Sequence, residues 1–389
     1  MHVVLINRYF HPDHSATSQM LSDLAFHLAG AGWEVEVITS RHRYDDPRAA
    51  LPPSETIRGV RTHRVWSTRF GRGSLPGRAI DYLSFYAASL IALLRQAKKG
   101  SVVIALTDPP LISVVAALAA RIRRATLINW TQDLFPEVAT ALGLHAPWPL
   151  RMLRNWSLRS ARTNVVLGEA MRARLSSLGI ANVVVQHNWA HDSLRPVPAA
   201  QNALRQQWFP LNPFVVSYSG NLGRAHDAAT LAAAIDELRN DRDIAFLFVG
   251  GGAQMQSIRD AGGDRVRFEP YQSIERLSES LSVADLHIVT LRSAMEGLIV
   301  PSKFYGILAV ARPVLFVGAT DGEIARLIAT LECGVVVAEG DARGLAARIR
   351  ELAAHRDAAA GMGARGRREY ERRFAPQVAL RTWEDILHG

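Results

Sequence analysis

The stretch "FVVSYSGNLGRAHD" (214–227) decides the predicted fold. An apolar, β-branched run ends at Ser219, Gly220 and Asn221, and a helix is expected to begin near Asp227. Glycines at such a junction let backbone N–H groups approach a ligand closely, and the helix N-terminus that follows favours a phosphate. The stretch therefore predicts a strand–loop–helix unit of a parallel sheet whose tip binds an anion.

The same alternation of β-branched runs and helical patterns extends over the whole chain. Strands are expected at 2–7, 34–40, 101–107, 125–131, 162–168, 182–188, 214–221, 244–252, 264–270, 284–291, 312–318 and 333–340. The segment 188–213 carries four prolines and lacks strand patterning, so it is expected to connect two domains. The predicted fold class is α/β, with two doubly wound Rossmann-like domains facing a central cleft and ligands beyond the carboxyl ends of the strands.

The composition of the 389-residue chain is that of a folded protein, with 48% hydrophobic and 21% charged residues. A chain of this length exceeds one ordinary core, which also favours two domains. No signal peptide is visible, and the longest uncharged apolar stretches, 82–94 and 109–120, are shorter than the ~20 residues that span a bilayer. The single cysteine, Cys333, rules out an internal disulfide and suits a reducing compartment. We therefore expect a soluble or peripheral protein.

The formal net charge of +9 favours a negatively charged partner, such as nucleic acid, an anionic membrane or a phosphorylated small molecule. Zinc fingers, aromatic RNA-binding motifs and basic low-complexity tails are absent from the sequence, which argues against nucleic acid. The match of "GMGARG" (361–366) to a dinucleotide fingerprint lies in a charged helical tract without a preceding strand, so we interpret it as a chance match.

Two further strand-to-helix junctions in the second half carry glycine or a cation. One is "VGGG" (249–252), which includes Gly251, and the other is "EGLIVPSK" (296–303), which puts Lys303 at a helix start. A cation is unfavourable at a helix N-terminus unless it shares an anion there. With Arg224 of the first junction, the three tips are expected to surround one diphosphate. The alternative is that each glycine only forms a tight turn.

Strand ends in the first half suggest an acceptor side. The loop 7–20 carries Arg8, His11 and His14, which are expected to face the cleft; a metal site at the two histidines would need further ligands that the sequence does not supply. In "TQDLFPE" (131–137), Asp133 and Glu137 are acids that could handle an acceptor hydroxyl. The alternative for Asp133 is an N-cap of the helix that follows.

The stretch 69–99 has aromatic and apolar residues between basic clusters. Its basic residues are Arg69, Arg72, Arg78, Arg95, Lys98 and Lys99. This pattern suits a helix that rests on an anionic membrane surface. A core helix with basic ends is an equally good interpretation.

The full chain resembles the retaining glycosyltransferases of family 4 with the GT-B fold, in the branch that builds bacterial surface polysaccharides. The likeness is carried by "SGNLGRAHD" (219–227), "FVGGG" (248–252), "EGLIVPSKFYGILAVARPVLF" (296–316) and "WTQDLFPE" (130–137). The resemblance implies an N-terminal Rossmann-like acceptor domain over 1–195 and a nucleotide-sugar domain over 196–371. It also implies that the C-terminal helix, 372–389, packs back onto the first domain near Trp383.

The resemblance also implies roles for individual residues. Glu296 would contact hydroxyls of the donor sugar and act with Asp133 as the catalytic pair, while the backbone of Gly297 and Leu298 would meet the sugar and diphosphate. The remaining donor-binding residues would be Gly220, Asn221, Arg224, Gly251, Tyr271 near the base, and Lys303. His14 and Glu137 would lie on the acceptor side. Transfer on one face of the sugar would need no metal, because the phosphate site stabilises the leaving diphosphate.

Three departures from the family pattern stand out. The second acid of the family's E-x7-E pattern, which binds ribose, is missing, because Phe304 or Gly306 occupies its place. The lysine usual after "SGN" is replaced by His226. In the first half, Ser15-Ala16 stands for a glycine pair and Gln132 for a histidine.

The leading hypothesis is therefore a metal-independent glycosyltransferase of the hexosyltransferase type. It would use a UDP-linked sugar without a cofactor and a lipid-diphosphate-linked or glycan acceptor in O-antigen or capsule synthesis. It would be cytoplasmic and peripheral on the inner face of the cytoplasmic membrane, with no nucleic-acid partner. One alternative is a nucleotide-sugar 2-epimerase of the same architecture. Another is a non-catalytic membrane-surface scaffold, which the missing second acid favours.

Overall fold

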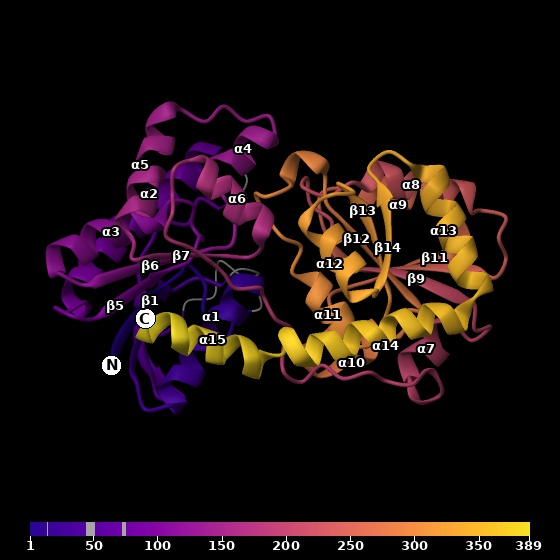
Figure 1. Cartoon of the computed structure of the whole chain (residues 1–389), viewed down its shortest axis with the longest axis horizontal. Helices are drawn as coiled ribbons and strands as arrows, with labels where there is room; N and C mark the ends of the chain where they lie inside the picture. Colours follow the sequence, from indigo (N-terminus) through magenta and orange to yellow (C-terminus); the bar gives the residue numbers. More distant parts are fainter. Residues whose placement is uncertain (14, 44–50, 72–74) are drawn as a thin grey trace. The chain divides into compact units, whose positions relative to one another are not determined.

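The computed structural model describes residues 1–13, 15–43, 51–71 and 75–389. The chain divides into two compact units (Figure 1). The first comprises Met1–His187 together with Ala379–Gly389, and the second comprises Asn188–Val378. Each unit contains its own sheet covered by helices, as the α/β prediction requires.

The sheet of the first unit has eight strands in the order β3-β4-β2-β1-β5-β6-β7-β8. The strands are β1 (His2–Ile6), β2 (Glu34–Ser40), β3 (Ser54–Ile57), β4 (Val60–Val65), β5 (Val102–Ala105), β6 (Thr126–Thr131), β7 (Thr163–Val166) and β8 (Val183–Val185). Only β3 and β4 pair antiparallel; the other neighbours are parallel. The carboxyl ends of the parallel strands therefore share one edge of the sheet.

The β3–β4 hairpin is an element that the sequence analysis did not predict. Its two-residue turn consists of Arg58 and Gly59, whose φ angles are +48° and +84°. Two consecutive left-handed residues match the right-handed twist of a hairpin. The pattern was missed because an Arg-Gly pair is a weaker turn signal than Asn-Gly.

The helices of the first unit cover both faces of its sheet. They are α1 (Ala16–Gly30), α2 (Leu75–Gln96), α3 (Ile112–Arg123), α4 (Glu137–Ala141), α5 (Trp148–Ser160) and α6 (Glu169–Ser177), together with the end of α15 (Pro376–His388). Helices α2 and α3 share one core with strand residues such as Val4 and Val103. On the other face, Trp383 of α15 lies against Trp130 of β6, with ring centroids 4.5 Å apart, and Glu384 contacts His27 of α1 at 2.7 Å.

Helix α2 lies within the stretch 69–99, where the sequence predicted a helix, and it extends beyond the uncharged apolar run 82–94. Within the described residues, Pro76–Gln96 is the one segment long and apolar enough to cross a membrane by length and composition alone. Core helices of globular proteins can meet the same criterion. In this fold, Phe85 and Leu93 on one face of α2 are fully buried in the core of the first unit.

The sheet of the second unit has six parallel strands in the order β11-β10-β9-β12-β13-β14. They are β9 (Phe214–Asn221), β10 (Ile244–Gly251), β11 (Val266–Glu269), β12 (Leu286–Thr290), β13 (Val314–Gly318) and β14 (Gly334–Ala338). The order reverses between β9 and β12, and ligands of open parallel sheets bind at such a switch point.

Helices again lie on both faces of the second sheet. They are α7 (Ala203–Trp208), α8 (Ala228–Glu237), α9 (Met255–Gly262), α10 (Ile274–Ser282), α11 (Lys303–Ala309), α12 (Glu323–Leu331), α13 (Ala342–Ala354) and α14 (Arg356–Arg373), with short 3-10 turns η1 (Ala199–Gln201), η2 (Gly263–Arg265) and η3 (Ser293–Met295). Helices α8, α9 and α13 share the main core of this unit (Figure 1). Right-handed crossovers place α10, α11 and α12 on the opposite face.

Two predictions about the second half can be compared with its elements. The connection 188–213 contains helix α7, which was not expected. It forms because Asn202 accepts a hydrogen bond from the Arg205 N–H at 2.8 Å, and Trp208 packs into a core cluster. "GMGARG" lies inside α14, which confirms that it is no dinucleotide loop. A side chain at Gly366 would approach Leu308 to 2.8 Å, so this glycine permits close helix packing.

Candidate functional site

Two glycine-rich strand ends lie side by side in the second unit. The parallel register of β9 and β10 pairs Gly220 with Gly250 and Asn221 with Gly251. Gly220 and Gly250 have φ angles of +119° and +117°, which side chains rarely adopt. A Cβ atom at Gly250 would lie 2.6 Å from the Gly220 carbonyl oxygen, so the two strand tips touch through bare backbone. This edge therefore offers main-chain groups to a ligand without side chains in the way.

The ring of Tyr271 borders these two tips. Its ring carbons would lie 2.9 Å from a Cβ atom at Gly250 and 3.7 Å from one at Gly251. The side chain is 63% exposed, although it lies against the glycines. An exposed aromatic ring at a ligand edge is suited to stacking on a planar base, and the predicted position of Tyr271 near a base is compatible with this geometry.

Lys303, the first residue of α11, lies beside the Gly220 turn. Its Nζ would be 3.6 Å from a Cβ atom at Gly220 and lies 3.7 Å from the centroid of the Tyr218 ring. Nζ donates to the Tyr218 hydroxyl, which in turn donates to the Asn221 carbonyl at 3.0 Å. Desolvation by burial lowers the pKa of Lys303 to about 7. A desolvated ammonium next to a glycine turn is therefore a cation that gains from binding an anion.

His226, at the place of the usual family lysine, does not supply a second cation. Its Nδ1 lies 2.6 Å from the Thr290 carbonyl oxygen, which can only accept, so Nδ1 carries the proton. Burial and then the charge of Lys303 lower the pKa of His226 to about 4. The imidazole is consequently neutral at physiological pH and leaves the local positive charge to Lys303.

Hydroxyl groups and the loop tip complete this edge. Within the described chain, the buried Oγ of Ser219 and Oγ1 of Thr290 have no hydrogen-bond partner. Thr290 is the last residue of β12 and Ser219 lies two residues before the end of β9, so a ligand at this edge could satisfy both hydroxyls. Asn221 and Arg224 are exposed in the following loop, and among the described residues Arg224 makes no ion pair. Arg224 is thus in the loop that follows the glycine-rich end of β9.

Glu296 is held at the N-terminus of α12. Its Oε1 accepts a hydrogen bond from the Glu323 N–H at 2.8 Å. Burial raises the pKa of Glu296; the Glu323 N–H opposes that rise, and the negative charge of the Glu323 carboxylate adds to it. The carboxyl group is partly buried, so it is oriented by the helix rather than free in solution. This contact to α12 could not be found from the linear sequence.

The backbone N–H of Leu298, which the resemblance assigns to the diphosphate, is already hydrogen-bonded within the protein. Gly297 has a φ of +71°, which a side chain would strain. The Leu298 N–H donates to the Met295 carbonyl at 3.0 Å, and the side chain is buried. A role of Leu298 in binding the diphosphate through its N–H would require this turn to open. Its predicted role therefore remains untested by the geometry.

Gly322 leaves the space that the Glu296 carboxylate occupies. A Cβ atom at Gly322 would lie 2.7 Å from the Glu296 Cδ and closer still to Oε2. The backbone of Gly322 is extended, with a φ of −74°, so alanine fits the backbone without strain. We therefore expect Gly322→Ala to displace the Glu296 carboxylate and lower turnover about tenfold to a hundredfold, because small misplacements of reacting groups are costly. UDP affinity should change less than threefold, since α11 and β9 are untouched.

The measurement is steady-state transfer kinetics next to calorimetric titration with UDP. Gly30→Ala, at the end of α1, is the matched control, because nothing lies within 4 Å of a Cβ atom there. Turnover of Gly322→Ala equal to that of this control would show that the position of Glu296 does not matter.

The place of the missing ribose acid is apolar. Phe304 is fully buried, and a Cβ atom at Gly306 would lie 3.8 Å from both Leu194 and Leu281. Neither position offers a carboxylate or a polar replacement. The ribose contact of the family pattern is therefore lost at this point of α11.

In the first unit, Asp133 lines a recess of about 130 Å³ at the carboxyl ends of β5 and β6. The recess is also lined by Thr107 and Asn129, whose Oγ1 and Oδ1 atoms are buried without a hydrogen-bond partner in the described structure. Asp133 keeps contact with solvent at the recess. Desolvation by the recess, followed by the nearby charge of Asp108, raises the pKa of its carboxyl group to about 6. Unpartnered acceptors and a carboxyl group of raised pKa suit a ligand rich in hydroxyls.

Glu137 has a different environment from Asp133. Its two carboxylate oxygens accept from the Arg154 guanidinium at 2.6 and 2.7 Å. Both side chains are largely buried, with 12% and 5% exposed. The structure therefore ties Glu137 into a bidentate ion pair, which occupies both oxygens that an acceptor hydroxyl would need.

The loop after β1 is only partly described. His14 lies outside the described residues, and so does Arg72. His11 packs its ring edge-on against Phe26, with centroids 5.6 Å apart. The Arg8 guanidinium lies over the Tyr82 ring of α2, 5.2 Å from its centroid.

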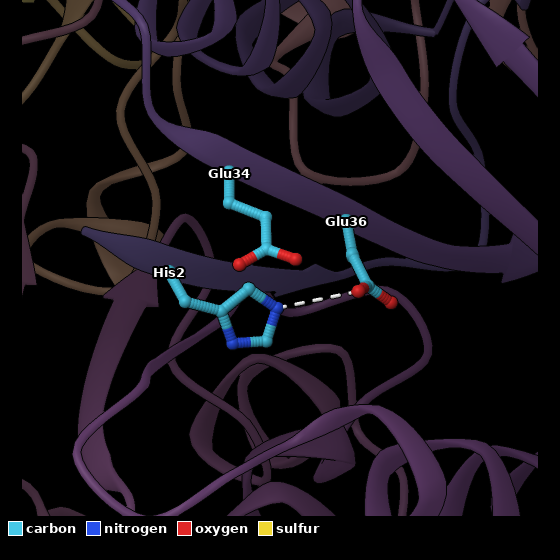
Figure 2. A group of neighbouring side chains, drawn as sticks. All are labelled: His2, Glu34 and Glu36. Atoms are coloured by element: carbon cyan, nitrogen blue, oxygen red, sulfur yellow. Dashed lines mark hydrogen bonds and ion pairs between the residues drawn. The ribbon is translucent and has the colours of Figure 1, made fainter.

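Another group of acids and histidines occupies the opposite edge of the first sheet. His2, Glu34 and Glu36 come from the amino ends of β1 and β2 and lie close enough to hold a cation (Figure 2). Glu36, however, already accepts from Arg61 at 2.7 Å and from His63 at 2.9 Å. Burial alone would raise the pKa of Glu36, but these hydrogen bonds outweigh it and lower the pKa to about 2. We interpret the group as an ion-pair network that fastens the strands.

Two Rossmann-like units, one with a glycine-rich edge beside a desolvated lysine, are the architecture expected of a GT-B glycosyltransferase. The family model described as "Glycosyl transferase 4-like domain" matches residues 16–189, and that described as "Glycosyl transferases group 1" matches residues 213–355. The chain belongs to this family of glycosyltransferases. The fold and family predicted from the sequence are confirmed.

Known proteins support the same assignment. The chain is 29% identical to the probable glycosyltransferase WbjE of Pseudomonas aeruginosa over 279 residues, which are 67% of this chain and 68% of the relative. It is 25% identical over the full length of both chains to the putative colanic acid biosynthesis glycosyl transferase WcaI of Escherichia coli. The structure of HepE from Anabaena in complex with UDP-glucose has the same fold, with a TM-score of 0.75 and 16% identity over 100% of this chain and 99% of that one.

Proposed function

We propose that this glycosyltransferase retains the configuration of the transferred sugar and uses a nucleoside-diphosphate sugar, expected to be UDP-linked. The acceptor would be a lipid-linked or other glycan in bacterial polysaccharide biosynthesis. The donor proposal is supported by the glycine edge with Lys303 and by a structural neighbour that binds UDP-glucose. The acceptor proposal draws on a relative named for colanic acid biosynthesis.

The observation that carries the proposal is the position of Lys303. Its ammonium is desolvated beside the bare Gly220 turn and contacts a tyrosine rather than a carboxylate. In a retaining transfer on one face, the acceptor oxygen bonds to the anomeric carbon while the bond from that carbon to the diphosphate oxygen breaks. The leaving oxygen takes the acceptor proton. Lys303 would stabilise the charge that develops on the diphosphate, where an oriented cation lowers the barrier most.

We further propose that the reaction needs neither a cofactor nor a metal ion. Lys303 and main-chain N–H groups at the strand ends would provide the positive charge that Mg²⁺ provides elsewhere. Glu296, which is hydrogen-bonded to the N-terminus of α12, would bind sugar hydroxyls. Asp133 would contact the acceptor in the recess that it lines. These two carboxyl groups belong to different units, so each is tested separately by variants.

The decisive experiment incubates the full-length chain with a panel of UDP-, GDP-, ADP- and dTDP-sugars and a membrane lipid extract as the source of acceptor. We expect release of one nucleoside diphosphate that depends on the extract and persists in EDTA. Conversion of the donor sugar without any acceptor would instead indicate an epimerase. Absence of both release and nucleotide binding across the panel would overturn the proposal.

A peripheral location on an anionic membrane surface is also proposed. Helix α2 exposes Ile80, Leu83 and Ile91 on one stripe, while Arg78 and Arg95 lie near its ends. The neighbouring helices α3 and α5 add exposed apolar residues, including Ile122, Trp148 and Met152. Exposed apolar groups with a basic rim fit an anionic bilayer, because hydrocarbon burial and attraction to headgroups act together. The occupant we favour is therefore the inner face of the cytoplasmic membrane.

Leu83→Glu is expected to reduce co-sedimentation with phosphatidylglycerol vesicles at least fivefold, since it removes apolar contact and adds a repelled charge. The matched control is Leu211→Glu, which alters a side chain that is 93% exposed in the second unit. Binding of the wild type should weaken at high salt. Equal sedimentation of both variants would contradict the assignment of this surface.

A further inference from the structure

A guanidinium at the ligand edge of the first sheet forms no ion pair within the described residues. Arg8 follows β1 directly, and its Nε is buried without a hydrogen-bond partner. In the described part of the chain, no ion pair or hydrogen bond engages the Arg8 guanidinium, which instead lies near the rings of Tyr9 and Tyr82. The side chain as a whole is half-buried, and its buried Nε is a donor whose acceptor an anionic ligand could supply.

The backbone of Arg8 is held by three hydrogen bonds. The Arg8 N–H donates to the Asp108 carbonyl at 2.6 Å, and the Arg8 carbonyl accepts from the Ser40 N–H at 2.9 Å. The Thr39 hydroxyl donates to the same carbonyl at 2.9 Å. Arg8 is therefore fixed between the ends of β2 and β5, at the edge where ligands of parallel sheets bind.

The carboxylate of Asp81 feels the charge of Arg8, but its hydrogen bonds go to other groups. The Asp81 carboxylate is engaged by the Thr68 hydroxyl at 2.7 Å and by the N–H groups of Phe70 and Gly71 at 2.9 Å. Burial lowers the pKa of His42 in the same region, and the positive charges of Arg69 and Arg8 lower it further than Asp81 raises it. At the position of His42, the positive charges therefore outweigh the negative charge of Asp81.

Apolar surface adjoins this positive region. The backbone of Phe70 is fastened to Asp81 of α2, and its side chain is 63% exposed. Tyr82, over which Arg8 lies, precedes Leu83 of the exposed α2 stripe. Trp66, in the segment leading to α2, is exposed as well. A cation beside exposed hydrocarbon-binding groups fits a ligand that combines a phosphate with a lipid chain.

We propose that Arg8, with Arg69 as a second cation, binds the phosphate groups of a lipid diphosphate whose hydrocarbon chain lies on Phe70 and the exposed stripe of α2. This inference rests on the proposed function and identifies where its lipid-linked acceptor is held. It concerns binding and positioning of the acceptor, not the chemical step. Arg8 binds because guanidinium donors match phosphate oxygens in pairs, which a lysine cannot reproduce.

The test is a calorimetric titration of the full-length chain with farnesyl diphosphate, farnesol and inorganic diphosphate. Arg8→Gln should weaken binding of farnesyl diphosphate about tenfold to a hundredfold. Arg8→Lys should recover part of the affinity, and Arg69→Gln, at an exposed position, should lower it severalfold without risk to folding. The matched control is Arg174→Gln on the exposed face of α6, with no expected effect.

UDP is titrated into every variant, because the donor site lies in the other unit. Unchanged UDP binding with weakened farnesyl diphosphate binding supports the inference. Equal farnesyl diphosphate affinity in Arg8→Gln and Arg174→Gln overturns it, whatever UDP does. Inorganic diphosphate binding as tightly as farnesyl diphosphate overturns the lipid part. A wild-type chain that does not bind UDP would instead refute the proposed function.

Discussion

Lys303→Met is expected to weaken UDP binding about a hundredfold while leaving the melting temperature unchanged or higher. The first effect follows because a desolvated cation that contacts a diphosphate contributes strongly, and its removal leaves that anion unpaired. The second follows because burial already disfavours the ammonium in the unliganded protein, as its pKa of about 7 shows. Methionine removes the buried charge at similar volume. Function and stability should therefore change in opposite directions, which simple unfolding cannot mimic.

The pH dependence of UDP binding gives an independent readout of the same group. Burial lowers the pKa of Lys303 in the free protein to about 7, whereas a bound diphosphate favours the charged form of the lysine. UDP binding is therefore accompanied by uptake of a proton above pH 7. UDP affinity should thus fall by up to tenfold per pH unit between about pH 7.5 and 9, where the phosphates, with a second pKa near 6, are already ionised. Lys303→Met should lack this slope.

Calorimetry with UDP and thermal unfolding test both expectations. Lys99→Met, at an exposed site, removes the same formal charge and should leave affinity and slope intact. A Lys303→Met protein that binds UDP as tightly as Lys99→Met would exclude Lys303 from the donor site.

Glu137→Ala is expected to lower the free energy of unfolding of the first unit by about 3 kcal/mol, since it leaves the buried Arg154 without its carboxylate. For a unit of this size, the melting temperature should fall by roughly 6–12 °C. The double variant Glu137→Leu/Arg154→Met should recover most of the loss, because the unpaired charge is gone. Thermal unfolding of the single and double variants measures this.

The matched control is the exposed pair Glu169–Arg172 at 2.5 Å, with about half of each side chain exposed. Glu169→Ala should cost less than about 1 kcal/mol. The result also decides between the two roles of Glu137. Full stability of Glu137→Gln together with a selective loss of turnover would assign it to the acceptor, as the sequence suggested, and would contradict a structural role.

Most of the fold could be predicted because its signals are local. The β-branched runs of β9 and β10 and the helical pattern of α1 each identify their own element. The elements that were missed depend on less local causes. The tight turn of the β3–β4 hairpin is formed by an Arg-Gly pair, which is unusual in such turns. Helix α7 is stabilised by the packing of Trp208 against residues far away in the chain.

The candidate site divides in the same manner. Gly220, Gly251 and Lys303 were identified because each lies at a strand-to-helix junction, and parallel strands bring such junctions to one edge. Glu296 was identified as well, but its contact with Gly322 and Glu323 joins segments that the pattern does not connect. Glu137 looked equivalent to Asp133 in the sequence, yet one is locked to Arg154 and the other lines a recess.

The sequence by itself determined the two-unit α/β fold class, because element type follows from local periodicity, and it placed the glycines and the lysine of the donor edge at strand-to-helix junctions. Its motifs resemble those of glycosyltransferases, which the family models confirm. The tertiary structure alone decided which charges are paired. Arg154 forms an ion pair with Glu137, 17 residues earlier in the chain, whereas Arg8 lies over the Tyr82 ring and forms no ion pair in the described structure. Pairing depends on distances between segments that only folding brings together, so the free and the engaged cations could not be told apart beforehand.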